Sequence, residues 1–157
     1  MQERLLKHWL IIAVQLLGTL CVGAALSAGT VLVSVNSDGL VTMENSAHAT
    51  ISAQGRFVAF HSRGALVLPD ENSGGFPDDD VFVRDMVDGA LTRVSVTSGG
   101  LEQPGESWDA SISDDGSHIA FTSSAMLASG DSAVYRDVFM RNRDTLRRPI
   151  VWLGMAT

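Results

Sequence analysis

The chain has 157 residues, of which 45% are hydrophobic and 18% charged, and its formal net charge is −7. This length and composition fit one globular domain with a real core and exclude a disordered chain. The acidic balance, with no basic stripe along the sequence, argues against nucleic acid as a partner. The single cysteine, Cys21, lies in the apolar N-terminal run, so neither a disulfide framework nor a thiolate metal site is expected.

Residues 1–28 have the pattern of an export segment. A short basic head ends at Trp9, and Leu10–Leu26 follows without a charge. Small residues close the stretch, so cleavage after Ser27 fits a secretory signal. A membrane anchor over residues 10–27 is the alternative, because about 17 apolar residues is the lower limit for crossing a bilayer. Both interpretations predict an exported protein, periplasmic or extracellular, or held at the membrane by this segment.

The rest of the chain is organised by an internal repeat, in which segments return after a shift of 61 positions. Three pairs of segments align at this shift: Val33–Leu40 with Val94–Leu101, Ala49–Gly55 with Ala110–Gly116, and Phe57–Ser62 with His118–Ser123. After a loop that is shorter in the second copy, Asp80–Asp85 aligns with Asp137–Asn142. Repeats of this length are typical of propellers and solenoids, in which each unit packs on its neighbours.

Each copy of the repeat predicts short strands separated by turns. In Phe57–Phe60 and in His118–Phe121, β-forming residues alternate between two faces, and a tight turn precedes each segment. Asp80–Asp85 alternates in the same way, and Leu91–Val96 follows the Asp88-Gly89 turn as a fourth strand. Four antiparallel strands in about 60 residues make one blade of a β-propeller.

The predicted fold is therefore all-β, with two four-stranded antiparallel propeller blades behind an N-terminal hydrophobic export helix. Residues 29–96 hold a leading strand and the first blade repeat, and residues 97–157 hold the second repeat and a C-terminal tail. The candidate fourth strand of the second blade is Arg147–Leu153, which Pro149 weakens because it lacks a backbone donor. Residues 31–35 match a fourth strand but precede any first strand, so we expect an incomplete propeller that needs further blades.

Residues 110–123 (ASISDDGSHIAFTS) resemble the WD40-like (PD40, TolB-type) β-propeller repeat, whose signature is S-x-S-P-D-G-x-x-I-A-F-x-S. Asp137–Arg141 is similar to that family's D-I-[FY]-V-M strand, and the likeness extends over most of residues 31–153. Asp114 and Ala53 replace the usual proline, and Gln54 replaces the turn aspartate in the first copy. The resemblance implies a binding scaffold.

The segment Asp70–Asp80 is the candidate for a metal site. Its oxygen-bearing residues Asp70, Asn72 and Asp78 fall at EF-hand-like offsets. The twelfth position, however, is Val81 instead of a bidentate glutamate, and the second copy has no equivalent segment. We interpret the segment as a solvated turn and predict no metal requirement, with calcium binding as the alternative.

The sequence contains no recognisable catalytic set. The histidines, His8, His48, His61 and His118, are too widely spaced for a paired-ligand motif, so they predict neither a metal site nor a cofactor. The closest match to a nucleophile elbow, Gly105–Asp109, lacks the second glycine. We therefore predict a protein without enzymatic activity.

Three side chains are candidate interaction residues. Trp108 is expected to pack against a neighbouring blade or to line the mouth of a central channel, where it would offer a stacking platform for a ligand. Arg84 and Arg141 occupy equivalent repeat positions, and we expect them to pair with loop carboxylates. None of the three indicates a particular ligand.

These features predict an exported, non-catalytic β-propeller-type module that binds protein partners or associates with itself. Two other functions fit the same residues: an accessory region of a larger hydrolase or lyase whose catalytic part is absent, and a truncated gene product without independent function. A peptidase would need a nucleophile elbow in a further domain. Two blades alone would leave apolar sheet faces without partners, so we expect association.

Overall fold

The computed structural model describes residues 29–68, 70, 78–132 and 135–146. Residues 1–31 form a unit separate from residues 32–157, and all strands belong to the second unit. The export segment predicted for residues 1–28 lies outside the described residues. Within the described ranges, no helix has the length and apolar character needed to cross a membrane.

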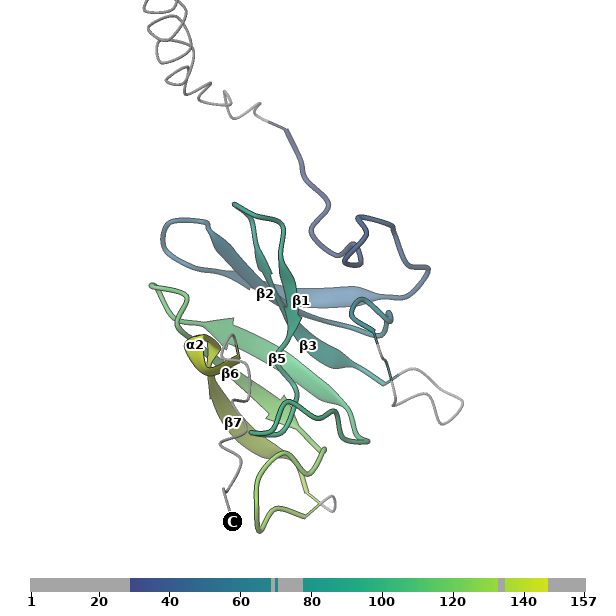
Figure 1. Ribbon diagram of the computed structural model, residues 1–157, viewed down its shortest axis with the longest axis vertical. Coiled ribbons are helices and arrows are strands. Elements are labelled where there is room, and N and C mark those ends of the chain that lie inside the picture. Colours follow the sequence, from purple (N-terminus) through teal and green to yellow (C-terminus); the bar gives the residue numbers. More distant parts are fainter. Residues whose placement is uncertain (1–28, 69, 71–77, 133–134, 147–157) are drawn as a thin grey trace, which may run out of the picture. The chain divides into compact units, whose positions relative to one another are not determined.

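Two antiparallel sheets form the second unit (Figure 1). The first sheet has the order β1-β2-β3-β4 and consists of β1 (Ser46–Ile51), β2 (Phe57–Ser62), β3 (Asp80–Asp85) and β4 (Leu91–Arg93). The second sheet has the order β5-β6-β7 and consists of β5 (Ser107–Ile112), β6 (His118–Ser123) and β7 (Asp137–Asn142). One turn of helix, α2 (Arg143–Leu146), follows β7. The all-β prediction is confirmed.

The predicted fourth strands differ from the structure in two ways. In the first sheet, β4 ends at Arg93 instead of Val96, although the Val94 amide still donates to the Val81 carbonyl at 2.7 Å. In the second sheet, the predicted strand Arg147–Leu153 lies outside the described residues. The described part of the second sheet therefore has three strands where four were predicted.

The turns before β2 and β6 are alike, as the repeat predicts. The Gly55 amide donates to the Ser52 carbonyl and the Gly116 amide to the Ser113 carbonyl, both at 2.8 Å. The φ angles of the two glycines are +70° and +72°, in the left-handed region that a side chain disfavours. The two turns are thus alike although the residues before the two glycines differ, Ala53-Gln54 in one and Asp114-Asp115 in the other.

The first strand of each sheet carries a bulge that the sequence analysis did not predict. The pairing register of β1 with β2 shifts between Ala47 and Thr50, and that of β5 with β6 shifts between Trp108 and Ser111. His48 and Asp109, which lie 61 positions apart, have positive φ angles of 49° and 54°. A bulge re-aims the residues beside it, so both sheets direct one polar side chain out of the ladder at the same repeat position.

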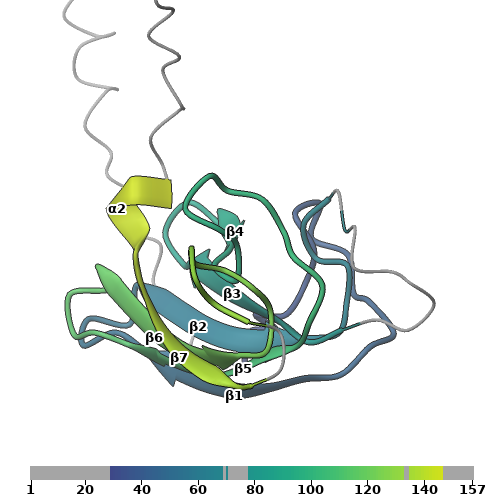
Figure 2. The same cartoon turned by 90° about the horizontal axis from the view of Figure 1, so that it is seen from below.

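The two sheets share one hydrophobic core because β5 packs against β1, β2 and β3 (Figure 2). On the first sheet the core is formed by one face of β2 and β3, here called the stacking face, and its residues are all buried: Phe57, Ala59, His61, Val81 and Val83. From the second sheet, Ala110, Ile119 and Phe121 enter the same core.

The other face of the first sheet, here called the far face, has a smaller core of its own. Val58, Phe60 and Phe82 are buried there under Leu66, and Val33 from the leading segment packs on them. The predicted leading strand over residues 31–35 is wrong: this segment joins neither sheet, and only Val35 forms a bridge, to Val41. Residues 35–41 instead form a hairpin, in which the Asn36 amide donates a hydrogen bond to the Leu40 carbonyl at 2.8 Å.

Candidate interaction site: the open face of the second sheet

The second sheet has a face that corresponds, position by position, to the stacking face of the first. Cross-strand pairs place Ala120 beside Met140, and Thr122 beside both Val138 and Trp108. Cross-strand neighbours point to the same side of a sheet. We call this surface the open face, and its residues are His118, Ala120, Thr122, Val138, Met140 and Trp108.

Equivalent residues on the two faces differ sharply in exposure. Val81 and Val83 of β3 are 0% and 3% exposed, whereas Val138 and Met140 of β7 are 80% and 71% exposed. The residue types are closely matched, so the difference arises from the second sheet, which packs on the stacking face through Ala110, Ile119 and Phe121. If Val138 and Met140 became as buried as Val81 and Val83, each side chain would contribute about 1.5–3 kcal/mol to the stability of the assembly.

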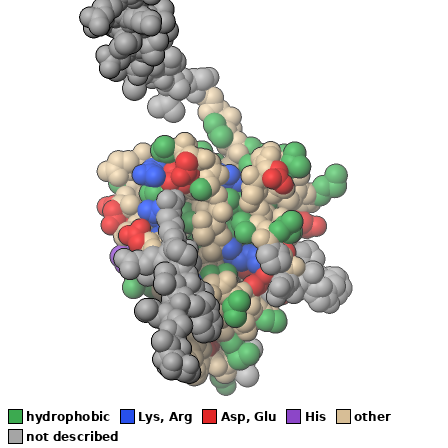
Figure 3. Space-filling model, viewed as in Figure 1, with side chains coloured by type: hydrophobic (Ala, Val, Ile, Leu, Met, Phe, Trp, Pro, Cys, Tyr) green, Lys and Arg blue, Asp and Glu red, His purple; other side chains and the backbone are tan. Residues whose placement is uncertain are grey.

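Apolar side chains are also exposed before and at the end of β1: Leu40, Val41, Met43 and Ile51. Ile51 pairs with Val58 and therefore lies on the far face. It is 62% exposed, while its repeat counterpart Ile112 packs against the shared core. In Figure 3, apolar side chains are exposed at several places on the visible face, between acidic and basic ones.

Trp108, predicted as an interaction residue, lies on the open face and is half-buried. The Arg136 guanidinium lies over its indole ring, 4.7 Å from the ring centroid. This contact is a cation–π interaction, which holds the ring against the sheet. Among the described residues, Trp108 is not part of the core shared by the two sheets, so its packing against a neighbouring blade stays a prediction.

The two bulges meet where the sheets adjoin. The Nδ1 atom of His48 lies 3.5 Å from Oδ1 of Asp109, and both side chains are about two-thirds exposed. The His48 ring also lies near His61 of the stacking face, with centroids 4.9 Å apart. Burial lowers the pKa of His61, so its imidazole is neutral at physiological pH. The histidines therefore form no cationic cluster at this edge.

A buried arginine, Arg93, is surrounded by three carboxylates. Its guanidinium lies 3.4 Å from Asp80 and 3.6 Å from Asp70, and it also pairs with Glu102. Burial raises the pKa of Asp80 to about 7, although Arg93 and the hydroxyl of Ser95 oppose that shift. Both ends of the predicted metal-site segment, Asp70 and Asp80, thus contact the same guanidinium.

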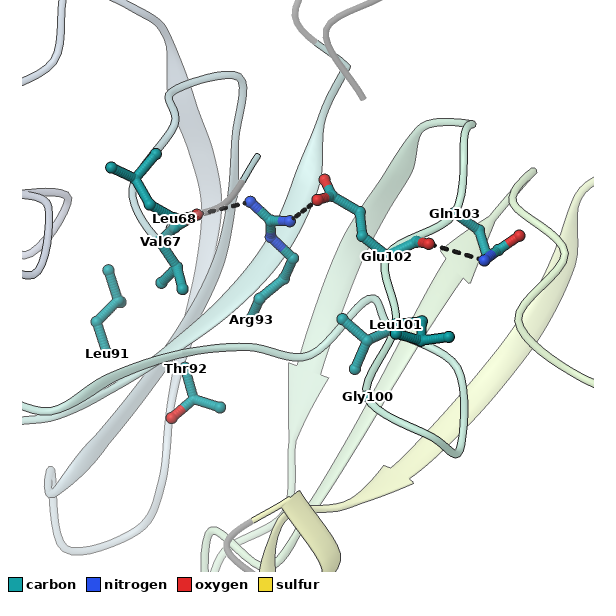
Figure 4. Close-up of a pocket in the computed structure, with 10 residues that line it drawn as sticks. Val67, Leu68, Leu91, Thr92, Arg93, Gly100, Leu101, Glu102 and Gln103 are labelled. Carbon is teal, nitrogen blue, oxygen red and sulfur yellow. Dashed lines mark hydrogen bonds and ion pairs between the residues drawn. The ribbon is translucent and has the colours of Figure 1, made fainter. Parts of the chain in front are cut away.

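The carboxyl groups of Asp70, Asp80 and Glu102 lie close enough together to hold a metal ion. In the structure the Arg93 guanidinium contacts all three of these carboxyl groups, and Figure 4 shows its pair with Glu102. Most of the remaining candidate calcium loop, residues 71–77, lies outside the described residues. The absence of a metal requirement stays a prediction.

Arg93 also lines an open groove of about 490 Å³ between Leu91 and Leu101 (Figure 4). Its guanidinium donates to the Val67 carbonyl at 2.9 Å on one side and pairs with Glu102 on the other. Because carboxylates already neutralise this arginine, the groove offers no net positive charge to an anionic ligand. The groove is therefore a poor candidate for the site of an anionic small molecule.

Among the described residues, the partners of Arg84 and Arg141 are backbone carbonyls instead of the predicted loop carboxylates. Arg84 donates to the backbone carbonyls of Val33 at 2.8 Å, of Gly89 at 2.8 Å and of Val35, while Arg141 donates to that of Thr97. Burial lowers the pKa of both guanidinium groups. Each arginine fastens to its sheet the hairpin that precedes that sheet, because buried carbonyls need donors.

Ser107, in the segment closest to a nucleophile elbow, is fully buried. Its hydroxyl donates to Ser123 at 2.8 Å, and Ser46 donates to Ser62 at the same distance in the first sheet. The pair is thus a repeated structural contact between the first two strands of each sheet. The sequence analysis did not single out Val138, Met140 or Arg93, although it aligned β7 with β3, because an alignment does not show which copy is covered.

No family model matches the chain. No curated protein matches it either. Among solved structures it is similar to a chain described as "Crystal structure of the tricorn protease", with 16% sequence identity and a TM-score of 0.39. The match covers 69% of this chain and 9% of that one, so this chain spans a small part of its length. A likeness of this degree identifies neither the activity nor the partners of the chain.

Proposed function

We propose that the chain is an exported, non-catalytic module of β-propeller type, whose open face binds a further β-sheet of the same repeat. The observation that carries the proposal is the contrast between Val81 and Val83, buried under β5, and Val138 and Met140, exposed at the same repeat positions. A blade buries its faces against two neighbours. The second sheet has such a neighbour on one face, and the proposed partner occupies the other.

Export is the second part of the proposal and rests on the sequence of residues 1–28 alone. Fractionation of cells that produce a C-terminally tagged chain tests it. We expect the tag outside the cytoplasm, either processed or membrane-bound. Soluble, unprocessed protein in the cytoplasm would contradict export without affecting the binding proposal.

A tandem chain tests whether the open face accepts a sheet. Two copies of residues 29–157 are joined in one polypeptide, which raises the effective concentration of the second copy to about the millimolar range. If the first copy's open face receives the second copy, the tandem should melt at a higher temperature than one copy and bind less hydrophobic dye per copy. Met140→Asp in the first copy should abolish the gain, whereas the same change in the second copy should leave it. A tandem that melts like a single copy would contradict the proposal.

A further inference from the structure

We propose that the sheet which covers the open face belongs to a second copy of this chain, stacked head to tail, with the far-face side of one copy on the open face of another. This inference rests on the proposed function and names its partner. The contact between the two sheets of one chain shows the geometry, because the residues on both sides of it recur 61 positions apart. In the proposed pair, β1 of the second copy, the repeat counterpart of β5, packs on the open face as β5 packs on the stacking face.

The apolar residues fit this arrangement. Ile112 of the second sheet packs into the core beside the stacking face, whereas Ile51, its counterpart in the first sheet, is 62% exposed. Val138 and Met140 correspond to the residues that form the other side of that core. In a head-to-tail pair, Ile51 of one copy and Val138 of the other take up positions equivalent to Ile112 and Val81. Both copies therefore bury side chains that the single chain leaves in solvent.

The hydrogen bonds between the sheets can also be repeated. Within one chain, the Thr50 hydroxyl donates to the Ala110 carbonyl at 3.2 Å, and the Ala53 amide donates to the Asp114 carbonyl at 2.9 Å. The repeat places Ser111, also a hydroxyl residue, where Thr50 stands. In the head-to-tail pair it faces the next copy's Ala49 carbonyl. The polar groups at the contact are thus of the types that the first contact already pairs.

The His48 and Asp109 side chains at the bulges alternate in this arrangement. His48 and Asp109 are paired within the chain but remain about two-thirds exposed, so each can meet a second neighbour. Head-to-tail stacking places Asp109 between its own His48 and that of the next copy. A head-to-head pair would instead bring like residues together, which is less favourable. A head-to-tail contact also repeats, and rings of about three or four copies would reach the six to eight blades of a closed propeller.

Disulfide trapping in the full chain tests the proposal. In a Cys21→Ser background, one preparation carries His48→Cys and another Asp109→Cys, and an exposed Asp38→Cys chain reports random collisions. On mild oxidation, mixing the first two should give dimers joined between positions 48 and 109 at least about tenfold above the collision control. Each preparation alone should give few dimers, because like positions do not meet in a head-to-tail contact.

Second substitutions give the trapping a direction. Met140→Asp should abolish the mixed dimer when placed in the Asp109→Cys chain, but not in the His48→Cys chain, whose open face that contact does not use. Ile51→Asp should show the opposite dependence. Mixed dimers at the collision level, dimers of like positions only, or equal effects in both chains would overturn the head-to-tail copy. The tandem chain distinguishes the two ideas: stabilisation of the tandem without trapped dimers would show that the open face accepts a sheet of this repeat only when it is tethered. That result would overturn the association of separate copies and leave the proposed function standing.

Discussion

The stacking face and the open face are two versions of the same surface, and only one of them is covered. The β3 sequence Asp-Val-Phe-Val-Arg-Asp and the β7 sequence Asp-Val-Phe-Met-Arg-Asn differ at only two positions. Yet β3 is buried along its whole length, and β7 is half or fully exposed throughout. The comparison teaches that burial in a repeat protein is assigned by the neighbouring unit, because a strand's own pattern marks only which residues share a face.

The largest difference in stability between the two faces is expected when the same charge is introduced on each of them. Val83→Asp puts an unpaired carboxylate into the shared core and should cost more than about 4 kcal/mol, enough to unfold the chain. Met140→Asp, at the same repeat position, should change the free energy of unfolding by less than about 0.5 kcal/mol under dilute conditions. Urea denaturation measures both. The milder Val83→Ala should cost about 2 kcal/mol and keeps the comparison measurable if Val83→Asp does not fold. Equal losses on the two faces would show that the open face is covered within the chain.

Two glycines separate backbone strain from packing between the sheets. Gly55→Ala and Gly116→Ala both place a side chain at positive φ, at a cost of about 1–2 kcal/mol. At Gly116 the new Cβ would lie 2.2 Å from Phe57 Cδ2, whereas at Gly55 its nearest neighbour is Ile51 Cδ1 at 3.7 Å. We expect Gly116→Ala to cost about 1–3 kcal/mol more than Gly55→Ala, because Phe57 must move within the core. Matching losses in thermal melts would mean that the turn before β6 does not press on the stacking face.

The repeat-equivalent aspartates of β3 and β7 should differ in their effect on pH dependence. The pKa of Asp80 is about 7 in the folded chain, above its ordinary value of 3.8, so the folded state keeps a proton that the unfolded state releases. Its contribution to stability is full below pH 4 and is lost as the pH rises to about 7.

Relative to Asp80→Asn, the natural chain should therefore lose on the order of 2 kcal/mol between pH 5 and pH 8. A hydrogen bond with Asp131 also raises the pKa of Asp137, but that carboxyl is exposed, so Asp137→Asn should alter the pH profile far less. Urea titrations of the natural chain and both variants at pH 5 and pH 8 measure these differences in the free energy of unfolding. The same pH profile in Asp80→Asn and the natural chain would show that burial of Asp80 is not what makes stability depend on pH.

The smallest effect is expected from the pair that links the bulges. His48 and Asp109 are exposed, and their atoms lie 3.5 Å apart. A double-mutant cycle with alanine at both positions should give a coupling below about 0.5 kcal/mol, weaker still in 0.5 M salt. A coupling above about 1 kcal/mol would indicate that the bulges, as well as the apolar core, hold the sheets together.

Much of the fold was predictable because it depends on local patterns. Alternation in Phe57–Phe60 and in Asp80–Asp85 identified β2 and β3, and the repeat transferred the prediction to β6 and β7. The glycine turns before β2 and β6 were predicted from residue type alone. The bulges at His48 and Asp109 were not, since neither residue type signals a positive φ as glycine does.

The candidate site was harder to predict because its residues stand out only by their exposure, which depends on the elements that pack beside them. Arg84 and Arg141 illustrate the limit: the sequence marks them as equivalent cations, but their partners are carbonyls of the hairpins that precede each sheet. Arg93 drew no attention, because Asp70, Asp80 and Glu102 approach it only once the loops are folded.

By itself, the sequence determined the strands, their turns, the repeat that relates the two sheets and the faces on which side chains fall together. These features follow from the period of two in a strand and from the conformational freedom of glycine, both of which act within a few residues. Only the tertiary structure decided that Val83 is buried and Met140 exposed, that Arg93 lies among the carboxyl groups of Asp70, Asp80 and Glu102, and that the leading segment forms a hairpin instead of a strand. Burial and charge pairing depend on which segments meet in space, and equivalent segments of one chain can meet different neighbours.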